Sequence, residues 1–487
     1  MGFMPKRFIG EHGRLLQLVM TSASIRKSSA VGLLLDQEKA YDRVHPSYLS
    51  QVMIRFGVPP PLVTTIIGLF FSTNISININ GFLTTPFVAQ RGLRQGDPLS
   101  PLLFNIAFDP FLRLISSDPL YRGFSFGQLQ DTRSPDDNSR PPSDNTCPPP
   151  PVKILAYADD VLVFLHSPSD FIRLKYAIDI YGAASNTKLN FNKTQAFSLS
   201  GDPLSNWQQF LISHNITSWH DRLSTHSLIY LGYPVYSSTA QRTLYVNQLT
   251  NKIALSCQIH SQRNLSIRGR VTVLNCLIFS RLWHVLRILP LTKKQIATFQ
   301  GLGSRFLNAN SFPRISFATL SFPRTQGGLG VLDPAVQIQA LQWRWLLPMA
   351  LSCSPSILVD SLFPSVLYPS VAYGLYLLKS TTPQPYLNHQ ITSASSLLFP
   401  IFRSKHFSTT TLHCFSVLFT AFDSLICRAF DDAVFYSSVA FTPSLDQSYT
   451  FTPSSLPPQD LSPNAGITYN DIRLFNTPSP ISQLHSH

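Results

Sequence analysis

The chain has 487 residues, with 38 Lys and Arg against 25 Asp and Glu, which gives a formal net charge of +13. A hydrophobic share of 44% is enough to form a sizeable buried core and excludes a chain that is disordered throughout. Charged residues make up only 13%, against about a quarter in typical soluble domains, and 38 prolines indicate long loops. The six cysteines form no CxxC pair, which excludes a zinc knuckle and a disulfide scaffold and favours reduced thiols inside the cell.

The first part of the chain predicts a mixed α/β segment. The apolar run Val31–Leu35 enters Asp36 and predicts a buried strand. Residues 75–79 alternate strictly between Ile and a polar residue, and the following Asn80-Gly81 indicates a hairpin turn. The N-terminus lacks the long apolar run of a signal peptide.

A helix is predicted to open at Asp97-Pro98, with Asp97 as its N-cap and Pro98 in its first helical position. Its apolar stripe consists of Leu99, Leu102, Leu103 and Ile106. Pro110 is expected to kink or end this helix, because proline cannot donate the backbone hydrogen bond that the helix interior needs.

Residues 128–151 are rich in Pro, Ser and Asp and end in a run of prolines. We expect this segment to be a disordered or polyproline II insertion. Beyond it, the apolar runs 153–156 and 161–165 flank a Tyr-Ala-Asp-Asp sequence at 157–160. This pattern predicts a hairpin that presents two acids at its turn.

The positive charge is concentrated in one stretch, because no acidic residue occurs between Asp221 and Asp333. This stretch contains thirteen basic residues: Arg222, Arg242, Lys252, Arg263, Arg268, Arg270, Arg281, Arg287, Lys293, Lys294, Arg305, Arg314 and Arg324. Removing these thirteen from the 38 basic residues leaves 25, which equals the number of acidic residues, so this stretch carries the whole surplus. A nucleic-acid backbone is the favoured partner, and a solvated surface without acids is the alternative. Residues 240–310 also have a helical pattern.

The last third of the chain is apolar but rich in Pro, Ser and Thr. Residues 361–378 carry no charge, but Pro364 and Pro369 interrupt them, which favours a buried or irregular segment over a membrane span. Residues 444–487 are polar and proline-rich, and we expect a disordered tail.

Three carboxylates are the best candidates for catalysis. Asp36 ends one predicted strand, and Asp159 and Asp160 lie at the predicted turn. Ionised carboxylates in such places are costly unless they are paired or bind a metal. Carboxylates from two strands that hold two Mg²⁺ ions are what in-line nucleotidyl transfer requires. The alternative for an isolated Asp-Asp turn is a solvated hairpin tip.

An ordered set of motifs resembles that of non-LTR retrotransposon reverse transcriptases of the fungal type. The motifs are residues 33–44 (LLLDQEKAYDRV, motif A), 91–105 (RGLRQGDPLSPLLFN, motif B), 157–160 (YADD, motif C), 190–194 (NFNKT, motif D) and 230–233 (YLGY, motif E). Residues 2–7 are similar to the end of the family's block before motif A. Five or six motifs in the right order are a strong signal, where any single one would be weak.

The resemblance implies roles for the residues of motifs A and C. Asp36 and Asp159 match the principal metal ligands and Asp160 the neighbouring acid, for two Mg²⁺ ions or Mn²⁺ in their place. Tyr41 matches the aromatic steric gate, whose ring would clash with a ribose 2′-OH and favour deoxynucleotides. Without the motif, Tyr41 would be interpreted as a packed core aromatic.

Motifs B and D are implied to bind the nucleotide. Arg94, Gln95 and Gly96 match the motif B turn, where Gly96 lets the backbone approach the nascent base pair and Gln95 can hydrogen-bond the nucleotide or template. A plain tight turn would explain Gly96 but not Gln95. Lys193 is the candidate to neutralise or protonate the leaving pyrophosphate, and Lys188 competes for that role.

Motif E and the basic stretch are implied to hold nucleic acid. Tyr230 and Gly232 belong to the primer grip, with aromatic and backbone contacts to the primer end. Arg268, Arg270 and Arg281 lie in a thumb-like segment, where they would contact phosphates of the template–primer duplex without reading its sequence.

The implied fold is α+β: a right-hand polymerase palm with an antiparallel sheet and packed helices, partial fingers, a helical thumb and an irregular C-terminal region. The expected divisions are a finger remnant (1–30), palm (31–235), basic helical thumb (236–345), unassigned apolar region (346–443) and disordered tail (444–487).

Two functional hypotheses follow. The first is an RNA-directed DNA polymerase that uses an RNA template, a DNA primer or duplex and dNTPs. The second is a catalytically inactive retroelement remnant that only binds nucleic acid, because the family's basic finger residues precede the first residue and the chain is expected to be N-terminally truncated. The sequence indicates no membrane association and no protein partner, and insertion into a genome would require access to the nucleus.

Overall fold

The structure is a computed structural model that describes residues 8–127, 149–309, 315–351, 373–374, 376–378, 413–429, 439–443 and 449–453. The expectations for residues 2–7, for nearly all of the insertion at 128–151, for most of the uncharged segment at 361–378 and for most of the tail at 444–487 lie outside these ranges.

Five strands form the central sheet in the order β6-β7-β1-β8-β9. The strands are β1 (Val31–Leu35), β6 (Ile154–Tyr157), β7 (Asp160–Leu165), β8 (Gln195–Ser198) and β9 (Ser218–His220). The predicted strand at 31–35 and the predicted hairpin at 153–165 are therefore confirmed. Neighbouring strands are antiparallel except that β8 and β9 run parallel, because the chain between them crosses over through helix α6 (Ser205–Ile212).

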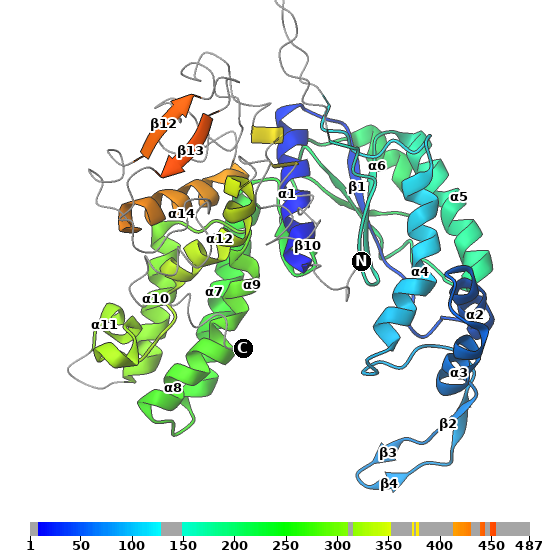
Figure 1. Ribbon diagram of the computed structural model, residues 1–487, viewed down its shortest axis with the longest axis horizontal. Helices are drawn as coiled ribbons and strands as arrows, with labels where there is room; N and C mark the ends of the chain where they lie inside the picture. Colours follow the sequence, from blue (N-terminus) through cyan, green and yellow to red (C-terminus); the bar gives the residue numbers. More distant parts are fainter. Residues whose placement is uncertain are drawn as a thin grey trace, which may run out of the picture.

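Helices cover both faces of this sheet, which is why its central strands are continuously apolar (Figure 1). One face packs against α2 (Pro46–Arg55), α3 (Pro60–Phe70), α4 (Ser100–Ser117), α5 (Pro168–Ser185) and α6, and the other against α1 (Ile9–Ile25). Successive side chains of β7 divide between the two cores. Val161, Val163 and Leu165 face the larger helical layer, and Leu162 and Phe164 face the layer of α1.

Helix α4 begins later than predicted and does not end at Pro110. The helix begins at Ser100, three residues after Asp97, and the Asp97 carboxylate instead accepts a hydrogen bond from the Leu99 N–H at 2.8 Å. Asp97 therefore caps the preceding turn and not the helix. Pro110 lies inside the helix, which continues to Ser117. Buried Phe108 and Phe111 on either side of the proline hold the helix together across the missing hydrogen bond.

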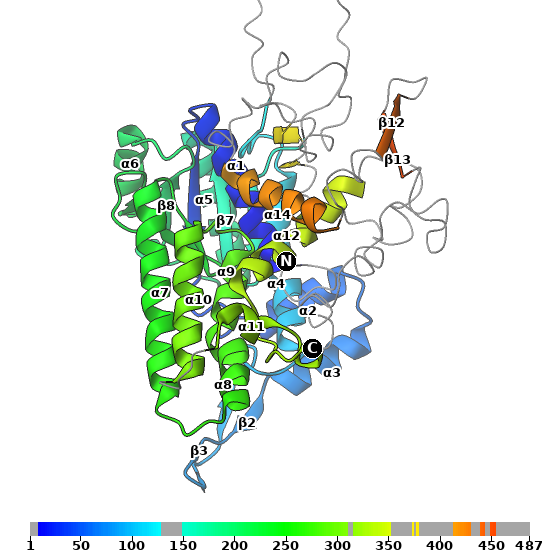
Figure 2. The same ribbon diagram turned by 90° about the vertical axis from the view of Figure 1, so that its left-hand side faces the viewer.

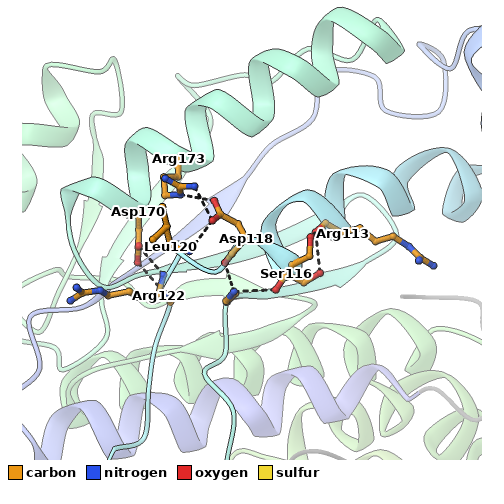
Figure 3. Close-up of polar contacts among 10 residues, drawn as sticks. Arg113, Ser116, Asp118, Leu120, Arg122, Asp170 and Arg173 are labelled. Atoms are coloured by element: carbon orange, nitrogen blue, oxygen red, sulfur yellow. Dashed lines mark hydrogen bonds and ion pairs between the residues drawn. The ribbon is translucent and has the colours of Figure 1, made fainter.

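A buried carboxylate fixes the chain between α4 and the insertion (Figure 3). Asp170, in the first turn of α5, is fully buried and accepts hydrogen bonds from the backbone N–H groups of Arg122, Gly123 and His166 at 2.8–3.0 Å. Nearby, the carboxylate of Asp118 accepts two hydrogen bonds from Arg173, which lower the pKa of Asp118. These contacts hold the chain after α4 against the first turns of α5.

A hairpin projects from the end of α3. It contains β2 (Thr73–Ile75), β3 (Asn78–Ile79), β4 (Phe82–Leu83) and β5 (Phe87–Ala89), with β2 paired to β5 and β3 to β4. The predicted turn is confirmed, since Asn80 and Gly81 both have positive φ and join β3 to β4. The alternating segment 75–79 does not form a single strand, since β2 ends at Ile75 and β3 begins at Asn78, and Ile77 and Ile79 are exposed.

Residues after the palm form a helical layer, as predicted from their pattern. The layer comprises α7 (Thr239–Ser261), α8 (Ile267–Val273), a π-helical segment (Leu274–Ile278), α9 (Ser280–Leu286), α10 (Lys293–Asn308), α11 (Phe317–Ser321) and a 3₁₀ turn (Arg324–Gln326). Figure 2 shows α7 and α10 side by side, and their buried side chains share one core with α8 and α9. In the π-helical segment, Asn275 bonds the backbone of Gly330 and Leu332 and ties the helices to the following loop.

Two helices are described in the C-terminal part of the chain. Helix α12 (Pro334–Leu351) packs against α14 (His413–Ala429), and α14 also contacts α1. Helix α14 is an ordered element within the region expected to be irregular; its sequence contains neither Pro nor Gly, and its apolar face is buried. None of the helices in the described ranges is both long and apolar enough to cross a bilayer.

Two short strands are described near the C-terminus. Strands β12 (Val439–Pro443) and β13 (Tyr449–Pro453) form an antiparallel pair, and β13 lies within the tail predicted to be disordered. Both strands alternate aromatic or apolar residues with Thr or Ala, and Phe441 pairs with Phe451. This composition favours cross-strand pairing, although each strand ends in a proline.

Candidate active site

Strand pairing brings the three predicted carboxylates to one end of the sheet. Leu35 pairs with Val161 in the β1–β7 register, so Asp36 and Asp160 are the next residues along the two strands. Tyr157 pairs with Asp160 across the β6–β7 hairpin, which leaves Asp159 in the turn. The turn is tight, because Ala158 has a positive φ of 55°. Two separate parts of the sequence thus place their acids at the same end of the sheet.

The carboxylates are close enough to repel each other. Partial burial raises the pKa of Asp160, and the negative charges of Asp159 and Asp36 raise it further. In the described ranges, no group of three or more His, Cys, Asp or Glu side chains is arranged to hold a metal ion. An open set of hard carboxylate oxygens under mutual repulsion fits a divalent cation that takes its remaining ligands from water or a substrate.

The acidic turn opens into a hollow of about 470 Å³. It is lined by Ile9, Tyr157, Ala158, Asp159, Asp160, Ile229, Leu231 and Gly232. The last three of these belong to the hairpin of β10 (Leu228–Tyr230) and β11 (Tyr233–Val235). Motif C and motif E therefore face one space, although about seventy residues separate them in the sequence.

Tyr41 lies between the acids and helix α4. Its ring stacks on Phe104 with centroids 4.4 Å apart and an interplanar angle of 10°. Burial raises the pKa of Tyr41, and the negative charge of Asp159 adds to the effect. Tyr41 is only half-buried, so it is a packed aromatic that still borders the acidic end of the sheet.

Motif B is bonded directly to motif A. The N–H groups of Leu93 and Gly92 donate to the carbonyl oxygens of Tyr41 and Val44, both at 2.9 Å. Gly92 has a φ of 92°, and a Cβ there would lie 2.9 Å from the carbonyl oxygen of Asp42. This close approach requires glycine.

The three predicted substrate residues of motif B differ in their surroundings. Gln95 and Gly96 are exposed, and a Cβ at Gly96 would meet nothing within 4 Å. Arg94 instead donates through Nη2 to the Leu69 carbonyl at 3.0 Å and to the Thr73 hydroxyl at 2.5 Å. Arg94 therefore attaches the projecting hairpin to motif B, while Gln95 and Gly96 face open space.

Motif D is joined to motif A through the backbone. The Asn190 N–H donates to the Asp36 carbonyl, and the Glu38 N–H donates to the Lys188 carbonyl, both at 2.9 Å. The Lys188 ammonium also lies 3.8 Å from the Glu38 carboxylate. Lys193 is exposed and has no bonded side-chain partner among the described residues. Of the two candidate lysines, Lys188 lies close to a carboxylate, whereas Lys193 has no ion-pair partner among the described residues.

Motif E forms a hairpin whose turn is Leu231-Gly232, with positive φ at both residues. Tyr230 is 2% exposed, and its hydroxyl lies 3.5 Å from the Leu155 carbonyl and 3.4 Å from the His12 ring. The aromatic contact expected of Tyr230 is therefore not available to a ligand in the hollow. Gly232 is exposed in the turn that lines the hollow.

Residues 1–235 match the family described as "Reverse transcriptase (RNA-dependent DNA polymerase)". This part of the chain is a reverse transcriptase domain. The resemblance to non-LTR retrotransposon reverse transcriptases, drawn from the motif set, is confirmed by the relatives that match this chain. The α+β palm follows from the same family and from the observed sheet.

Three relatives show the extent of this similarity. The transposon TX1 149 kDa protein of Xenopus laevis is 28% identical over 345 residues, which cover 70% of this chain and 24% of the relative. The R2DM Pol polyprotein of Drosophila melanogaster is 30% identical over 117 residues, 24% of this chain and 11% of the relative. The R2 Pol polyprotein of Popillia japonica is 25% identical over 266 residues, 52% of this chain and 33% of the relative. The chain thus spans at most a third of the length of these relatives.

Among solved structures, a telomerase from Candida Tropicalis in complex with a fragment of telomeric RNA aligns with 76% of this chain and 52% of its own. The identity is 11% and the TM-score is 0.33.

The predicted thumb arginines follow the reverse transcriptase domain on α8 and α9. Arg268 is exposed and has no bonded side-chain partner in the described ranges. Arg270 approaches the Leu307 carbonyl at 3.5 Å, and Arg281 donates to the Ser256 hydroxyl at 2.8 Å. The three cations therefore lie on one helical layer, and Arg268 is the least engaged.

Sequence patterns did not identify one residue that lies next to the reverse transcriptase motifs. His284 on α9 contacts the motif E turn, with its Nε2 2.9 Å from the Leu231 carbonyl oxygen. No motif contains His284, and its apolar neighbours in α9 are typical of a packed helix face. Only the tertiary structure reveals this contact.

Proposed function

We propose that the chain is an RNA-directed DNA polymerase of a non-LTR retrotransposon, which adds dNTPs to the 3′-OH of a primer on an RNA template. The observation that carries the proposal is the convergence of Asp36, Asp159 and Asp160 at the end of a reverse transcriptase sheet. The mutual repulsion of these acids is the electrostatic condition that bound cations would relieve.

The residues around the acids have distinct roles in this proposal. Asp36, Asp159 and Asp160 would hold two Mg²⁺ ions, which supply Lewis-acid activation of the 3′-OH and neutralise charge on the triphosphate. Tyr41 would exclude a ribose 2′-OH, supported by its stack on Phe104. Lys193 would protonate the leaving pyrophosphate.

Motif B and the thumb would position the substrates. Gln95 and Gly96 are exposed and would contact the nascent base pair. Arg94 has a supporting role, because its guanidinium holds the projecting hairpin. Arg268, Arg270 and Arg281 would bind duplex phosphates. Because Tyr230 is buried, we assign the primer contact to the turn that contains Gly232.

Primer extension tests the proposal. The full chain is incubated with an RNA template annealed to a DNA primer, dNTPs and Mg²⁺, and extension products are measured. Extension supports the polymerase. Absence of extension, with salt-sensitive duplex binding retained, would support the inactive remnant instead. Replacing Mg²⁺ by Mn²⁺ or by EDTA in the same assay identifies the metal requirement.

Tyr41→Val is expected to admit ribonucleotides, because it removes the ring that would meet the 2′-OH. We expect the ratio of rNTP to dNTP incorporation to rise on the order of tenfold or more. Tyr41→Phe is the matched control, since it keeps the ring and the stack on Phe104 and should leave the ratio unchanged. An unchanged ratio in Tyr41→Val would show that Tyr41 is only a packing residue.

Arg268→Gln is expected to weaken duplex binding equally for all sequences. Each phosphate contact that is lost should reduce the slope of log affinity against log salt by about one. The effect should be largest at Arg268 and smaller at Arg270 and Arg281, which also bond the protein. Lys175→Gln, on the exposed side of α5, is the control. An unchanged slope in the triple arginine variant would contradict the thumb assignment.

A further inference from the structure

The motif E hairpin is held from two sides. On the palm side, the Tyr230 hydroxyl lies within hydrogen-bond reach of the Leu155 carbonyl on β6, two residues before the motif C tyrosine. On the thumb side, His284 of α9 reaches the carbonyl oxygen of Leu231. The turn between these attachments lines the same hollow as Asp159 and Asp160.

His284 makes two contacts with this hairpin. Its Nε2 is 2.9 Å from the Leu231 carbonyl oxygen, and its ring stacks on Tyr233 with centroids 4.1 Å apart and an angle of 25°. A carbonyl oxygen can only accept, so Nε2 must carry the proton and donate. The stack orients the imidazole so that this donor points at the turn.

The backbone of the turn needs such support. Leu231 has a φ of 50°, a conformation that residues with a Cβ seldom adopt and that a two-residue turn of this type usually assigns to Asn or Gly. At Gly232, φ is 79°, and a Cβ would lie 3.1 Å from Nε2 of His284. Conformations of this kind persist where the surroundings fix them. The hydrogen bond from His284 and the partial burial of the Leu231 side chain provide that fixation.

We propose that His284 is a positioning residue, which holds the Leu231-Gly232 turn in the conformation that places a primer 3′ end opposite Asp159 and Asp160. The inference rests on the proposed polymerase function. His284 touches neither the acids nor the hollow and acts through the turn. Because His284 belongs to the thumb helices, the contact also connects the duplex-binding layer to the catalytic end of the palm.

Two substitutions separate the donor from the ring. His284→Phe keeps a ring for the stack on Tyr233 but cannot donate to Leu231. His284→Gln loses the ring but keeps an amide donor of similar reach. We expect His284→Phe to lower the incorporation rate about tenfold at saturating primer–template and dNTP, and His284→Gln to recover most of the rate. The affinity for primer–template and its salt dependence should stay at the wild-type level in both variants.

A second measurement reports on the environment of the primer 3′ end and does not require catalysis. The probe is an RNA template annealed to a DNA primer with 2-aminopurine at its 3′ terminus, and fluorescence is compared between bound wild type and His284→Phe. Altered fluorescence at equal occupancy is expected. Substitutions of His226, which is exposed in the loop before β10, by Phe and Gln are the matched controls and should leave both readouts unchanged. If His284→Phe lowers the unfolding temperature, His284→Leu replaces it in the same comparison.

The outcomes distinguish this inference from the proposed function. Wild-type fluorescence in the variant without the donor would overturn the positioning role, whether or not the chain extends primers. Extension by the wild type with an unchanged rate in His284→Phe would overturn it as well and leave the polymerase proposal standing. Altered fluorescence in a chain that never extends a primer would support the positioning role and defeat the polymerase proposal.

Discussion

Asp159→Asn is expected to reduce primer extension on the order of a thousandfold. The reason is that an amide cannot replace the charge of a carboxylate that holds a catalytic cation, and such charge stabilisation contributes several kcal/mol to the transition state. Asp36→Asn should have a similar effect, since Asp36 comes from the opposite strand of the same site. The measurement is the rate of single-nucleotide incorporation on an RNA template with Mg²⁺.

A loss of activity by unfolding can be separated from this effect. Asp160 has a raised pKa because Asp159 and Asp36 repel its negative charge. A raised pKa in the folded state means that ionisation of this acid is less favourable in the folded than in the unfolded protein. Removing a neighbouring negative charge should therefore leave the unfolding temperature equal or slightly higher. Duplex binding should also persist. Asp179→Asn, exposed on α5, is the control that should retain full extension.

The double variant is the strictest test of the assignment of these acids to catalysis. If Asp159→Asn combined with Asp160→Asn still extended a primer, the assignment of these acids to catalysis would be wrong. If the single variants lost both activity and stability, the acids would have a structural role that their mutual repulsion does not predict.

The parts of the fold that the sequence predicted are those with a strong local pattern. Strand β1 is a continuous apolar run, and the β6–β7 hairpin has apolar runs on both sides of its acidic turn. The Asn80-Gly81 turn follows from the conformational freedom of those two residues. The order of the motifs alone is enough to assign Asp36 and Asp159 to one site.

The differences from prediction arise where a distant contact decides the local structure. The predicted substrate residue Arg94 also bonds an acceptor on α3 and another on β2, contacts that no local pattern indicated. Tyr230 was expected to contact the primer, but its hairpin packs against β6 and buries the ring. The contact of His284 joins residues separated by more than fifty positions and has no local signal.

The C-terminal helix illustrates the same limit. Helix α14 was not predicted, because its apolar residues gain stability only against α1 and α12. Arg14 of α1 is buried beneath it, donates to the Cys414 carbonyl and lies 5.2 Å from the ring of Phe415. Burial lowers the pKa of Arg14. The sequence around Arg14 does not indicate that this side chain is buried or that its partner lies 400 residues away.

Asp170→Ala is expected to destabilise the protein by about 3–4 kcal/mol, the largest stability effect among the predictions for this chain. The carboxylate is fully buried and accepts from three backbone N–H groups, at Arg122, Gly123 and His166 (Figure 3). Alanine would leave these donors without a partner and without access to water. Gly123 cannot move away easily, since its backbone lies against that of Val152.

Chemical denaturation measures this effect, and Asp170→Asn refines it. The amide keeps one acceptor oxygen but loses the second oxygen and the charge, so its cost should fall between wild type and Asp170→Ala. Asp179→Ala, on the exposed face of the same helix, should change stability by less than about 0.5 kcal/mol. A cost for Asp170→Ala as small as that of Asp179→Ala would show that the segment 121–124 finds other acceptors. Because this segment pairs with Val152 immediately before β6, its loss should also disorder the hairpin that carries Asp159 and Asp160.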